Sequence, residues 1–367
     1  MSKNNEFTIN ESTLNKLSKE KKSSGFEFKT WDDWFNSFFL TEPTDNSQQL
    51  MEKVVYNFFH NQDFENWIKN FALNLNDIWN EPSARNLDPS INTPHDVMNH
   101  SAIVIGKGPS LKKKNHLEKL KNSNYKGSII CTDGALINVL NSGITPDLFP
   151  NFYVVTIEPY EIQTRLYDDP IVDKFGSKIN GIFSTLTHPD AVKRARTAGI
   201  KIHWLHTLFD YDEGKKSINN LSSLMVRAKK NTGLPAIQTG GNVGTSCWFV
   251  GWKILKCTTI TLIGMNHGWD EDDPIETIMS HGNMFEVPII DKDSKLFKKF
   301  FPKIYNPEFK STCILDPIFQ YYSSALKEFI SRSPPELTTI NATEGGSLFG
   351  AKIHCKPFEI FLNDFNL

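Results

Sequence analysis

Short β-branched runs that alternate with helical segments predict an α/β fold with a Rossmann-like, doubly wound, mostly parallel sheet. We expect an N-terminal helical region and a C-terminal helical segment around this sheet. Glycine and polar residues follow most of the runs, as they do where parallel strands end at a ligand crevice. The 367 residues, of which 39% are hydrophobic, are enough for a sizeable core. The expected strands are 102–105, 128–131, 152–157, 181–184, 201–205 and 259–263.

Changes in composition along the chain indicate four segments. Residues 1–30 are rich in Lys, Asn, Ser and Glu and predict a flexible polar arm. Residues 31–99 carry aromatic residues at helical spacing, followed by a proline-containing linker, so they predict a helical region. We expect the Rossmann-like nucleotide-binding domain at 100–300 and a closing segment at 301–367.

Overall charge and cysteine content exclude several classes of protein. The net charge of −2 gives no electrostatic reason to expect a nucleic-acid partner. The five cysteines form no Cys-x-x-Cys pair, so neither a zinc site nor a disulfide framework is indicated. No signal peptide and no apolar run long enough to cross a membrane is evident. We therefore expect a soluble, cytoplasmic protein, whose oligomeric state the sequence leaves open.

The strongest local feature is the glycine turn that follows the first expected strand. It contains Gly106, Lys107, Gly108, Pro109 and Ser110. Glycine lets a backbone approach an anion, proline is tolerated in a first helical turn, and amides at a helix start favour negative charge. The turn predicts a phosphate site. A plain tight turn between strand and helix is the alternative, because the third glycine of the dinucleotide fingerprint is missing.

Two other turns offer groups that suit a nucleotide. Gly240, Gly241 and Asn242 precede an apolar helical run and predict either a second anion-binding helix start or close helix packing. Asp133 and Gly134 follow the second expected strand. Here the carboxylate either caps the next helix or contacts a ribose hydroxyl or magnesium.

Candidates for acid–base chemistry follow the later strands. Glu158 ends the third expected strand, and His188 lies beyond the fourth. Glu158 is a candidate carboxylate for contacting a metal, contacting a ribose or activating an acceptor, and His188 is a candidate general base or phosphate contact. Asn266 and His267 follow the last expected strand, and His267 is a candidate phosphate contact or base. No Ser-His-Asp order or His-Glu-x-x-His helix supports a hydrolase.

A polar, glycine-rich turn near the C-terminus follows a further apolar start. It contains Asn341, Thr343 and Glu344. This turn either completes the site or simply reverses the chain.

Taken together, six segments resemble one superfamily, which contains the archaeal 6-hydroxymethylpterin diphosphokinase (MptE-like) domain and the motility accessory factor glycosyltransferases. The resemblance covers about residues 101–350. The segments that carry it are 104–111, 133–135, 143–147, 240–243, 262–266 and 340–346.

The resemblance divides between the two branches of the superfamily. Kinase-like members carry an Asp-rich segment where this chain has Glu158 and a His-x-His-Gly-Asp-Asn motif where it has His188. The two turns at 240–243 and 340–346 instead resemble the glycosyltransferase branch, whose sites bind a nucleotide-activated nine-carbon sugar acid. The superfamily's usual aspartate after Ile-Gly-x is Asn266 here.

The resemblance therefore implies a nucleotide-dependent transferase. Our leading hypothesis is a glycosyltransferase-like enzyme that moves a sialic-acid-like sugar from its nucleotide to a small-molecule, glycan or protein acceptor. The glycine turns and Asn266 would bind the nucleotide, Glu158 or His188 would deprotonate the acceptor, and His267, Asn341, Thr343 and Glu344 would orient substrate. The alternatives are a magnesium-dependent diphosphokinase that uses ATP and a pterin alcohol, and a nucleotide-binding module without catalysis. A metal ligand set is not identified, and a role for Mg²⁺ stays open.

Overall fold

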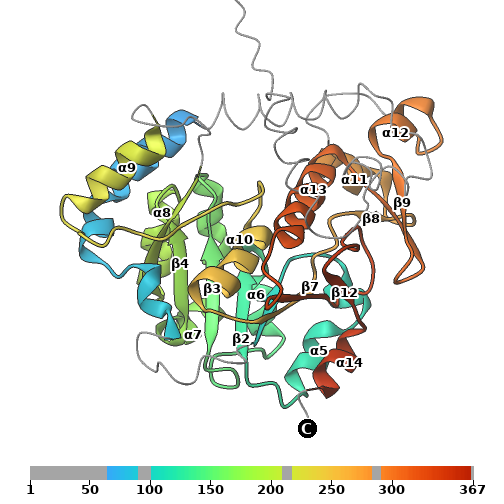
Figure 1. The fold of residues 1–367 in the computed structure, drawn as a ribbon, viewed down its shortest axis with the longest axis horizontal. Coiled ribbons are helices and arrows are strands. Elements are labelled where there is room, and N and C mark those ends of the chain that lie inside the picture. The colour runs from blue at the N-terminus through green and yellow to red at the C-terminus, as the bar shows by residue number, and fades with distance from the viewer. Residues whose placement is uncertain (1–63, 90–100, 209–216, 283–290, 365–367) are drawn as a thin grey trace, which may run out of the picture.

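The computed structural model describes residues 64–89, 101–208, 217–282 and 291–364. Its centre is a sheet of nine strands, all paired in parallel (Figure 1). This confirms the predicted Rossmann-like α/β fold. In spatial order the strands are β12 (Ile353–Cys355), β11 (Thr338–Asn341), β7 (Thr259–Ile263), β1 (Ser101–Ile105), β2 (Ser128–Thr132), β3 (Phe152–Thr156), β4 (Asn180–Ser184), β5 (Lys201–Thr207) and β6 (Ala236–Ile237).

Helices cover both faces of the sheet, as βαβ connections require. One face packs against α5 (His116–Lys121), α6 (Asp133–Asn141), α7 (Pro170–Phe175), α8 (Pro189–Thr197) and α14 (Phe358–Asn363). The other face packs against α10 (Val243–Phe249), the π-helix η6 (Val250–Ile254) and α13 (Pro317–Ser331). Outside these two layers lie α4 (Ser110–Lys113), α9 (Ile218–Arg227) and the 3₁₀ helices η2 (Ala84–Leu87), η4 (Glu161–Leu166) and η5 (Gly176–Lys178).

Strand β1 shows how one sequence run serves both faces. All five of its residues are buried. Because side chains alternate along a strand, Ile103 and Ile105 enter the core beneath α5 and α6. Ala102 and Val104 enter the core beneath α10 and α13. A continuous apolar run is therefore what a central parallel strand needs.

The order of the strands reverses beside β1. The chain adds β2 to β6 one after another on one side of β1, and then returns to place β7 on the other side. The register pairs Ile105 with Ile263, so the loops that leave the two strands start side by side. Ligands of open α/β sheets bind in the crevice outside the carboxyl ends of strands at such a reversal. The fold thus directs attention to the loops after β1 and β7.

The C-terminal segment contributes more than closing helices. Residues 301–367 supply β11 and β12, which extend the parallel sheet beyond β7. A separate antiparallel sheet joins β8 (Trp269–Asp270), β10 (Ser311–Ile314) and β9 (Lys303–Asn306). Next to it lie α11 (Ile275–Gly282) and α12 (Lys295–Phe300), whose apolar residues form a small core of their own with β10.

The aromatic N-terminal region forms a helix where the structure describes it. Residues 64–80 are helical, and Phe71, Leu75 and Ile78 pack into the core beneath α6 and α8. The amides of Asn70 and Asn74 donate to backbone carbonyls in the loops after β3 and β4. This helix therefore fixes two loops at the carboxyl edge of the sheet. The predicted polar arm (1–30), residues 31–63 and residues 90–100 lie outside the described residues.

Candidate functional site

The glycine turn after β1 is closed by the loop after β7. The amide of Gly106 donates to the carbonyl of Ile263 at 2.9 Å, and that of Gly108 donates to the carbonyl of Gly264 at 2.7 Å. A Cβ on Gly106 would lie 2.4 Å from the Gly264 oxygen. The glycines are thus required by the contact between the two loops. The amides of Gly106 and Gly108 thus donate within the protein, and the phosphate site at this turn stays a prediction.

Asn266 joins the same two loops through its side chain. Its Oδ1 accepts a hydrogen bond from the Ser110 hydroxyl at 2.8 Å and one from the Ser110 amide at 3.4 Å. The amide oxygen does here what a carboxylate oxygen would do, since both accept hydrogen bonds. Asn266 can therefore join the loops after β1 and β7 although it replaces an aspartate. The predicted role of Asn266 in nucleotide binding stays a prediction.

Asp133 is a buried carboxylate at the carboxyl end of β2. It is the first residue of α6 and is 4% exposed. Its Oδ1 accepts from the Gly134 amide at 2.7 Å, whereas its Oδ2 has no hydrogen-bond partner among the described residues. Burial raises the pKa of Asp133 to about 6, with the Gly134 amide, the nearby Thr156 hydroxyl and the charge of Lys107 opposing the shift. The Lys107 side chain lies over this helix start, with its Cδ 3.3 Å from an added Cβ on Gly134.

We expect Asp133→Asn to stabilise the protein at neutral pH. A carboxyl pKa raised from 3.8 to about 6 means that the unfolded chain releases this proton at a lower pH than the folded chain does. The free energy of unfolding then falls as pH rises from 4 through 6, by about 3 kcal/mol at most. In Asp133→Asn this fall in the free energy of unfolding is absent, because the amide at position 133 does not ionise. Urea unfolding at pH 4 and pH 7 measures the difference, and an equal pH dependence in both proteins would contradict it.

His267 is a buried imidazole directly after the β7 turn. It has a φ of +42°, is 7% exposed, and stacks on Phe319 with ring centroids 6.0 Å apart. Burial lowers the pKa of His267 to about 3, and nearby Lys327 and His281 act in the same direction. Its Nδ1 has no partner among the described residues. The free nitrogen of a neutral imidazole can donate a hydrogen bond to a ligand or accept one from it, depending on the tautomer. The neutral ring does not supply positive charge for a phosphate.

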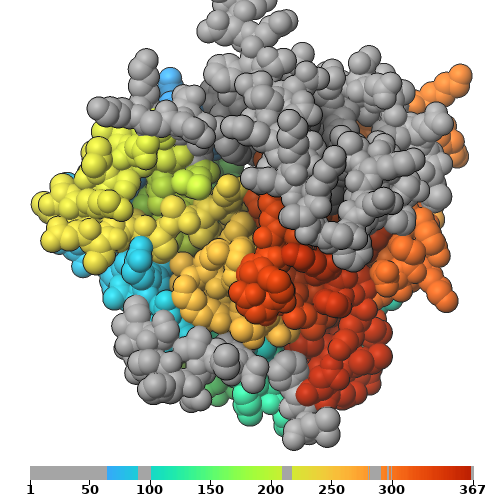
Figure 2. Space-filling model, in the orientation of Figure 1, coloured from blue at the N-terminus to red at the C-terminus, as the bar shows by residue number. Residues whose placement is uncertain are grey.

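Helix α13 lies against the second glycine turn (Figure 2). A Cβ on Gly241 would come within 2.7 Å of the rings of Tyr321 and Tyr322, so glycine is required for this contact, and its φ of +81° favours glycine too. Asn242 caps α10 by accepting from the Thr245 amide at 2.8 Å. Close packing and capping therefore explain this turn. An anion site at Gly240, Gly241 and Asn242 stays a prediction.

Glu158 and Tyr322 bring two further elements to the carboxyl edge. Glu158 follows β3, and Tyr322 belongs to α13. Burial raises the pKa of Tyr322 well above its ordinary value, and the charge of Glu158 adds to the shift. Glu158 is half-buried and lies near enough to affect this phenol electrostatically. The structure thus brings Glu158 beside α13, whereas its catalytic role stays a prediction.

His188 is the N-cap of α8. Its Nδ1 accepts a hydrogen bond from the Asp190 amide at 3.3 Å. A neutral imidazole that accepts at Nδ1 carries its proton on Nε2, so neither nitrogen holds a free lone pair. This geometry disfavours His188 as the group that takes a proton from an acceptor. Its catalytic role is untested.

The polar turn after β11 uses its side chains inside the protein. Asn341 donates to the Leu348 carbonyl at 2.5 Å and accepts from the Thr343 amide at 2.9 Å. The Thr343 hydroxyl accepts from the amide of Met265 at 3.3 Å. Asn341 thus stabilises the turn internally, and Thr343 holds it against the loop after β7. Their predicted contact with substrate stays a prediction.

Glu344 connects two helices instead of facing the crevice. Its Oε1 lies 3.3 Å from Nε2 of the buried His116 and accepts from the Phe358 amide at 3.2 Å. Burial lowers the pKa of His116 to about 4, so the ring is neutral at pH 7. Glu344 therefore links α5 to the start of α14. No substrate-orienting geometry follows from this placement.

Sequence reasoning missed Asn70 and Asn74. Asn70 donates to the Pro159 carbonyl at 2.9 Å and the Leu186 carbonyl at 3.0 Å, and Asn74 donates to the Thr187 carbonyl at 2.8 Å. Their helical spacing of four residues, with both amides on one face, is a signal that could have identified a polar contact. It could not have identified the loops that are contacted.

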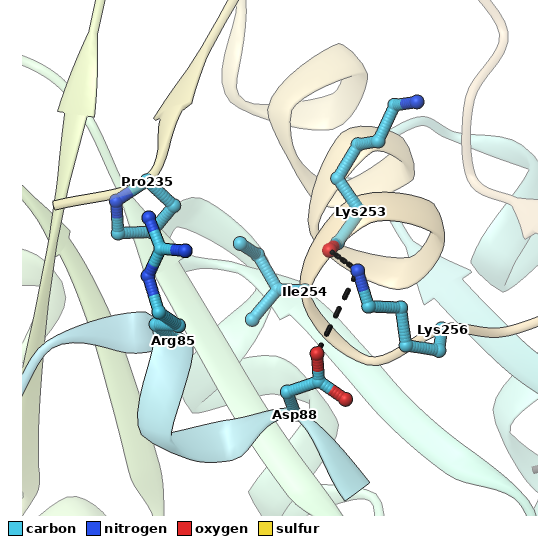
Figure 3. Close-up of a pocket in the computed structure, with 6 residues that line it drawn as sticks. All are labelled: Arg85, Asp88, Pro235, Lys253, Ile254 and Lys256. Atoms are coloured by element: carbon cyan, nitrogen blue, oxygen red, sulfur yellow. Dashed lines mark hydrogen bonds and ion pairs between the residues drawn. The ribbon is translucent and has the colours of Figure 1, made fainter. Parts of the chain in front are cut away.

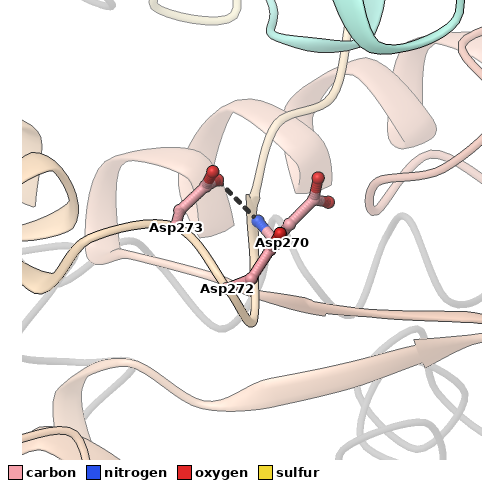
Figure 4. Close-up of side chains that lie close together, drawn as sticks. All are labelled: Asp270, Asp272 and Asp273. Atoms are coloured by element: carbon pink, nitrogen blue, oxygen red, sulfur yellow. Dashed lines mark hydrogen bonds between the residues drawn. The ribbon is translucent and has the colours of Figure 1, made fainter.

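Two clusters outside the crevice have ordinary explanations. Asp270, Asp272 and Asp273 group their carboxylates, and the Asp270 amide donates to Asp273 at 2.8 Å (Figure 4). The ammonium of Lys113 lies 2.5 Å from Asp270 and 3.2 Å from Asp273, so a protein cation already offsets part of the charge of this cluster. A cavity of about 100 Å³ between η2, the start of β6 and the end of η6 is lined by the Lys256–Asp88 ion pair (Figure 3).

The fold is that of a doubly wound α/β protein whose strand order reverses between β1 and β7. The chain belongs to the 6-hydroxymethylpterin diphosphokinase MptE-like family, whose model matches residues 69–272. No curated protein matches the chain. Membership of the family supports a transferase-like function.

One solved structure to which the chain is similar is that of the Maf glycosyltransferase from Magnetospirillum magneticum AMB-1. It matches with a TM-score of 0.42 and 16% sequence identity. The match covers 71% of this chain and 34% of that chain, so this chain spans about a third of the glycosyltransferase's length.

Within the described ranges, no helix combines the length and the apolar character that crossing a bilayer requires.

Proposed function

We propose that this chain is a nucleotide-dependent transferase whose donor is a nucleotide-activated, sialic-acid-like sugar. The observation that carries the proposal is Asp133. A buried carboxylate with one oxygen unused by the fold lies at the carboxyl end of β2, next to the strand reversal. Leaving such an oxygen unpaired costs free energy, which a ligand that donates hydrogen bonds recovers. The two hydroxyls of a ribose are such donors.

Lys107 supports the placement of a phosphate beside this ribose. Its side chain lies over the start of α6, and its charge acts on Asp133. The backbone amides of Gly106 and Gly108 are engaged in the loop contact, so the lysine supplies the positive charge. A nucleoside monophosphate linked to a sugar carries a single phosphate, which one ammonium can match. Positive charge at this point would also stabilise the leaving phosphate as negative charge develops.

The second candidate is the magnesium-dependent diphosphokinase that uses ATP. The unused Oδ2 of Asp133 is the kind of oxygen that magnesium takes as a ligand, and Glu158 follows the neighbouring strand. In that case Asp133 would hold the metal on the triphosphate and Lys107 would contact the phosphates. Magnesium would then supply the charge neutralisation that phosphoryl transfer requires.

A thermal-shift panel separates the two candidates. The purified chain is heated with CMP, CDP, UDP, GDP, ATP or a pterin alcohol, each with and without magnesium. Ligands that bind the folded state raise its apparent stability, by about 2.7 kcal/mol at one hundred times the dissociation constant. We expect CMP to stabilise the chain with little dependence on magnesium. Stabilisation by magnesium-ATP together with the pterin would favour the kinase, and no stabilisation by any nucleotide would contradict both.

A further inference from the structure

A histidine and a buried aspartate form a pair at the start of α13. The Nδ1 of His281 in α11 lies 2.6 Å from Oδ2 of Asp316. Asp316 is fully buried, and it also accepts from the indole of Trp269 at 2.8 Å and from the Phe319 amide at 2.8 Å. The imidazole of His281 stacks on the Phe319 ring with centroids 4.3 Å apart. Packing and hydrogen bonds therefore fix both the position and the plane of this ring.

The aspartate also determines which nitrogen of His281 carries the proton. A carboxylate accepts hydrogen bonds, so Nδ1 must donate and the neutral ring must hold its free lone pair on Nε2. The side chain is 35% exposed, so this ring is open to solvent in part. An imidazole held at Nδ1 by a buried carboxylate, with Nε2 available to take a proton, is the arrangement that serves general-base catalysis on unrelated folds. His188 shows the opposite arrangement, because its Nδ1 accepts.

Ring contacts on α13 connect the pair to the loop after β7. His267, which follows the β7 turn, stacks on the same Phe319 ring that His281 stacks on. One turn further along α13, Tyr322 contacts the Gly241 turn and is affected by the charge of Glu158. Helix α13 thus connects His281 to residues that follow β3 and β7. In the sheet, β7 lies beside β1 and β3 lies beside β2, so β7 and β3 flank these two strands.

We propose that His281 is the general base that deprotonates the acceptor hydroxyl and that Asp316 is its positioning residue; this inference rests on the proposed sugar transfer. The acceptor's O–H proton moves to Nε2 of His281. The acceptor oxygen forms a bond to the anomeric carbon of the donor, and the bond from that carbon to the phosphate oxygen breaks. The electron pair of the broken bond leaves with the nucleoside monophosphate. The same step with water as acceptor hydrolyses the donor.

The first measurement needs no turnover. Diethyl pyrocarbonate acylates an imidazole nitrogen that holds a free lone pair, and peptide mass spectrometry locates the product. In the folded chain we expect His281 to react at a rate within threefold of the exposed His354. In Asp316→Asn the side-chain amide can donate a hydrogen bond to Nδ1 of His281. The proton of the neutral ring then lies on Nε2, and the lone pair lies on Nδ1, which faces residue 316. We expect at least a tenfold slower reaction of His281 there, with His354 unchanged.

The second measurement follows nucleotide release from CMP-sialic acid, with water as acceptor. We expect His281→Gln to lose 10²- to 10⁴-fold in turnover, the range for removal of a general base, while CMP raises its melting temperature as it does that of the parent chain. Free imidazole added to His281→Ala should restore part of the turnover, which it would not do for a merely structural histidine. His354→Gln is the matched control.

The experiments distinguish a failure of the general-base assignment from a failure of the proposed transferase function. If CMP stabilises the parent chain but His281→Gln turns over within twofold of it, the base assignment is overturned and the transferase proposal stands. Lack of acylation at His281 in the folded chain also overturns the assignment, because Nε2 is then inaccessible. If CMP neither stabilises the chain nor is released, the proposed function fails, and the general-base role fails with it.

Discussion

Replacing Gly106 with alanine is expected to lower the free energy of unfolding by about 2 to 4 kcal/mol. The new Cβ would lie 2.4 Å from the backbone oxygen of Gly264 and 2.8 Å from the sulfur of Met265. Backbone atoms cannot rotate out of the way as side chains can, so the loops after β1 and β7 must separate. Separation also weakens the hydrogen bond from Gly106 to Ile263. The shift in the urea midpoint measures the effect.

Gly134→Ala is the matched control for this prediction. Gly134 lies in the first turn of α6, where the nearest atom to an added Cβ is the flexible Cδ of Lys107 at 3.3 Å. Alanine is a better helix former than glycine by roughly 0.5 to 1 kcal/mol, so the control should not be destabilised. Equal stability of Gly106→Ala and Gly134→Ala would contradict the close contact at the strand reversal.

Asp316→Ala is expected to destabilise the chain by about 2 to 3 kcal/mol, from loss of a helix cap and from half-buried donors left without a partner. The cap belongs to the 15-residue α13, and the donors are the indole of Trp269 and the ring of His281. Asp316→Asn keeps an oxygen that can accept from the Phe319 amide, so it should lose markedly less stability. Urea unfolding of both variants tests this order, and the reverse order would contradict the assigned contacts.

The two Asp316 variants also distinguish an effect on stability from an effect on turnover. If the alanine variant unfolds at low urea while the asparagine variant stays near the parent, then loss of turnover in the asparagine variant reflects the orientation of His281. Both effects are expected at one carboxylate because Asp316, which caps α13, also contacts His281 in the last turn of α11.

The strands that could be predicted from the sequence are those whose side chains enter the cores on both faces of the sheet. The six expected runs correspond to β1, β2, β3, β4, β5 and β7. Each is a β-branched or apolar run that a parallel strand buried on both faces requires. The strands β6 and β12 have two and three residues, and such lengths leave no periodic signal. Their positions depend on neighbouring strands that pair with them.

The candidate site was predictable only in outline. The rule that ligands bind at carboxyl ends of strands placed Asp133, Glu158 and Asn266 at one edge of the sheet. The sequence could not show that Gly106 serves a loop contact, because its neighbour Gly264 lies 158 positions later. Nor could it show the pair of His281 and Asp316, which forms only when α11 and α13 pack together.

Direct titration of the parent chain with CMP in the presence of a metal chelator tests the central claim, that a nucleotide binds at the carboxyl end of β2. Isothermal titration calorimetry of the parent and of Asp133→Asn provides the comparison. We expect binding by the parent and an affinity at least tenfold lower for the variant, while the variant itself is the more stable protein at pH 7. Equal affinity in the two proteins, or binding by the parent only when magnesium and ATP are supplied, would contradict the account.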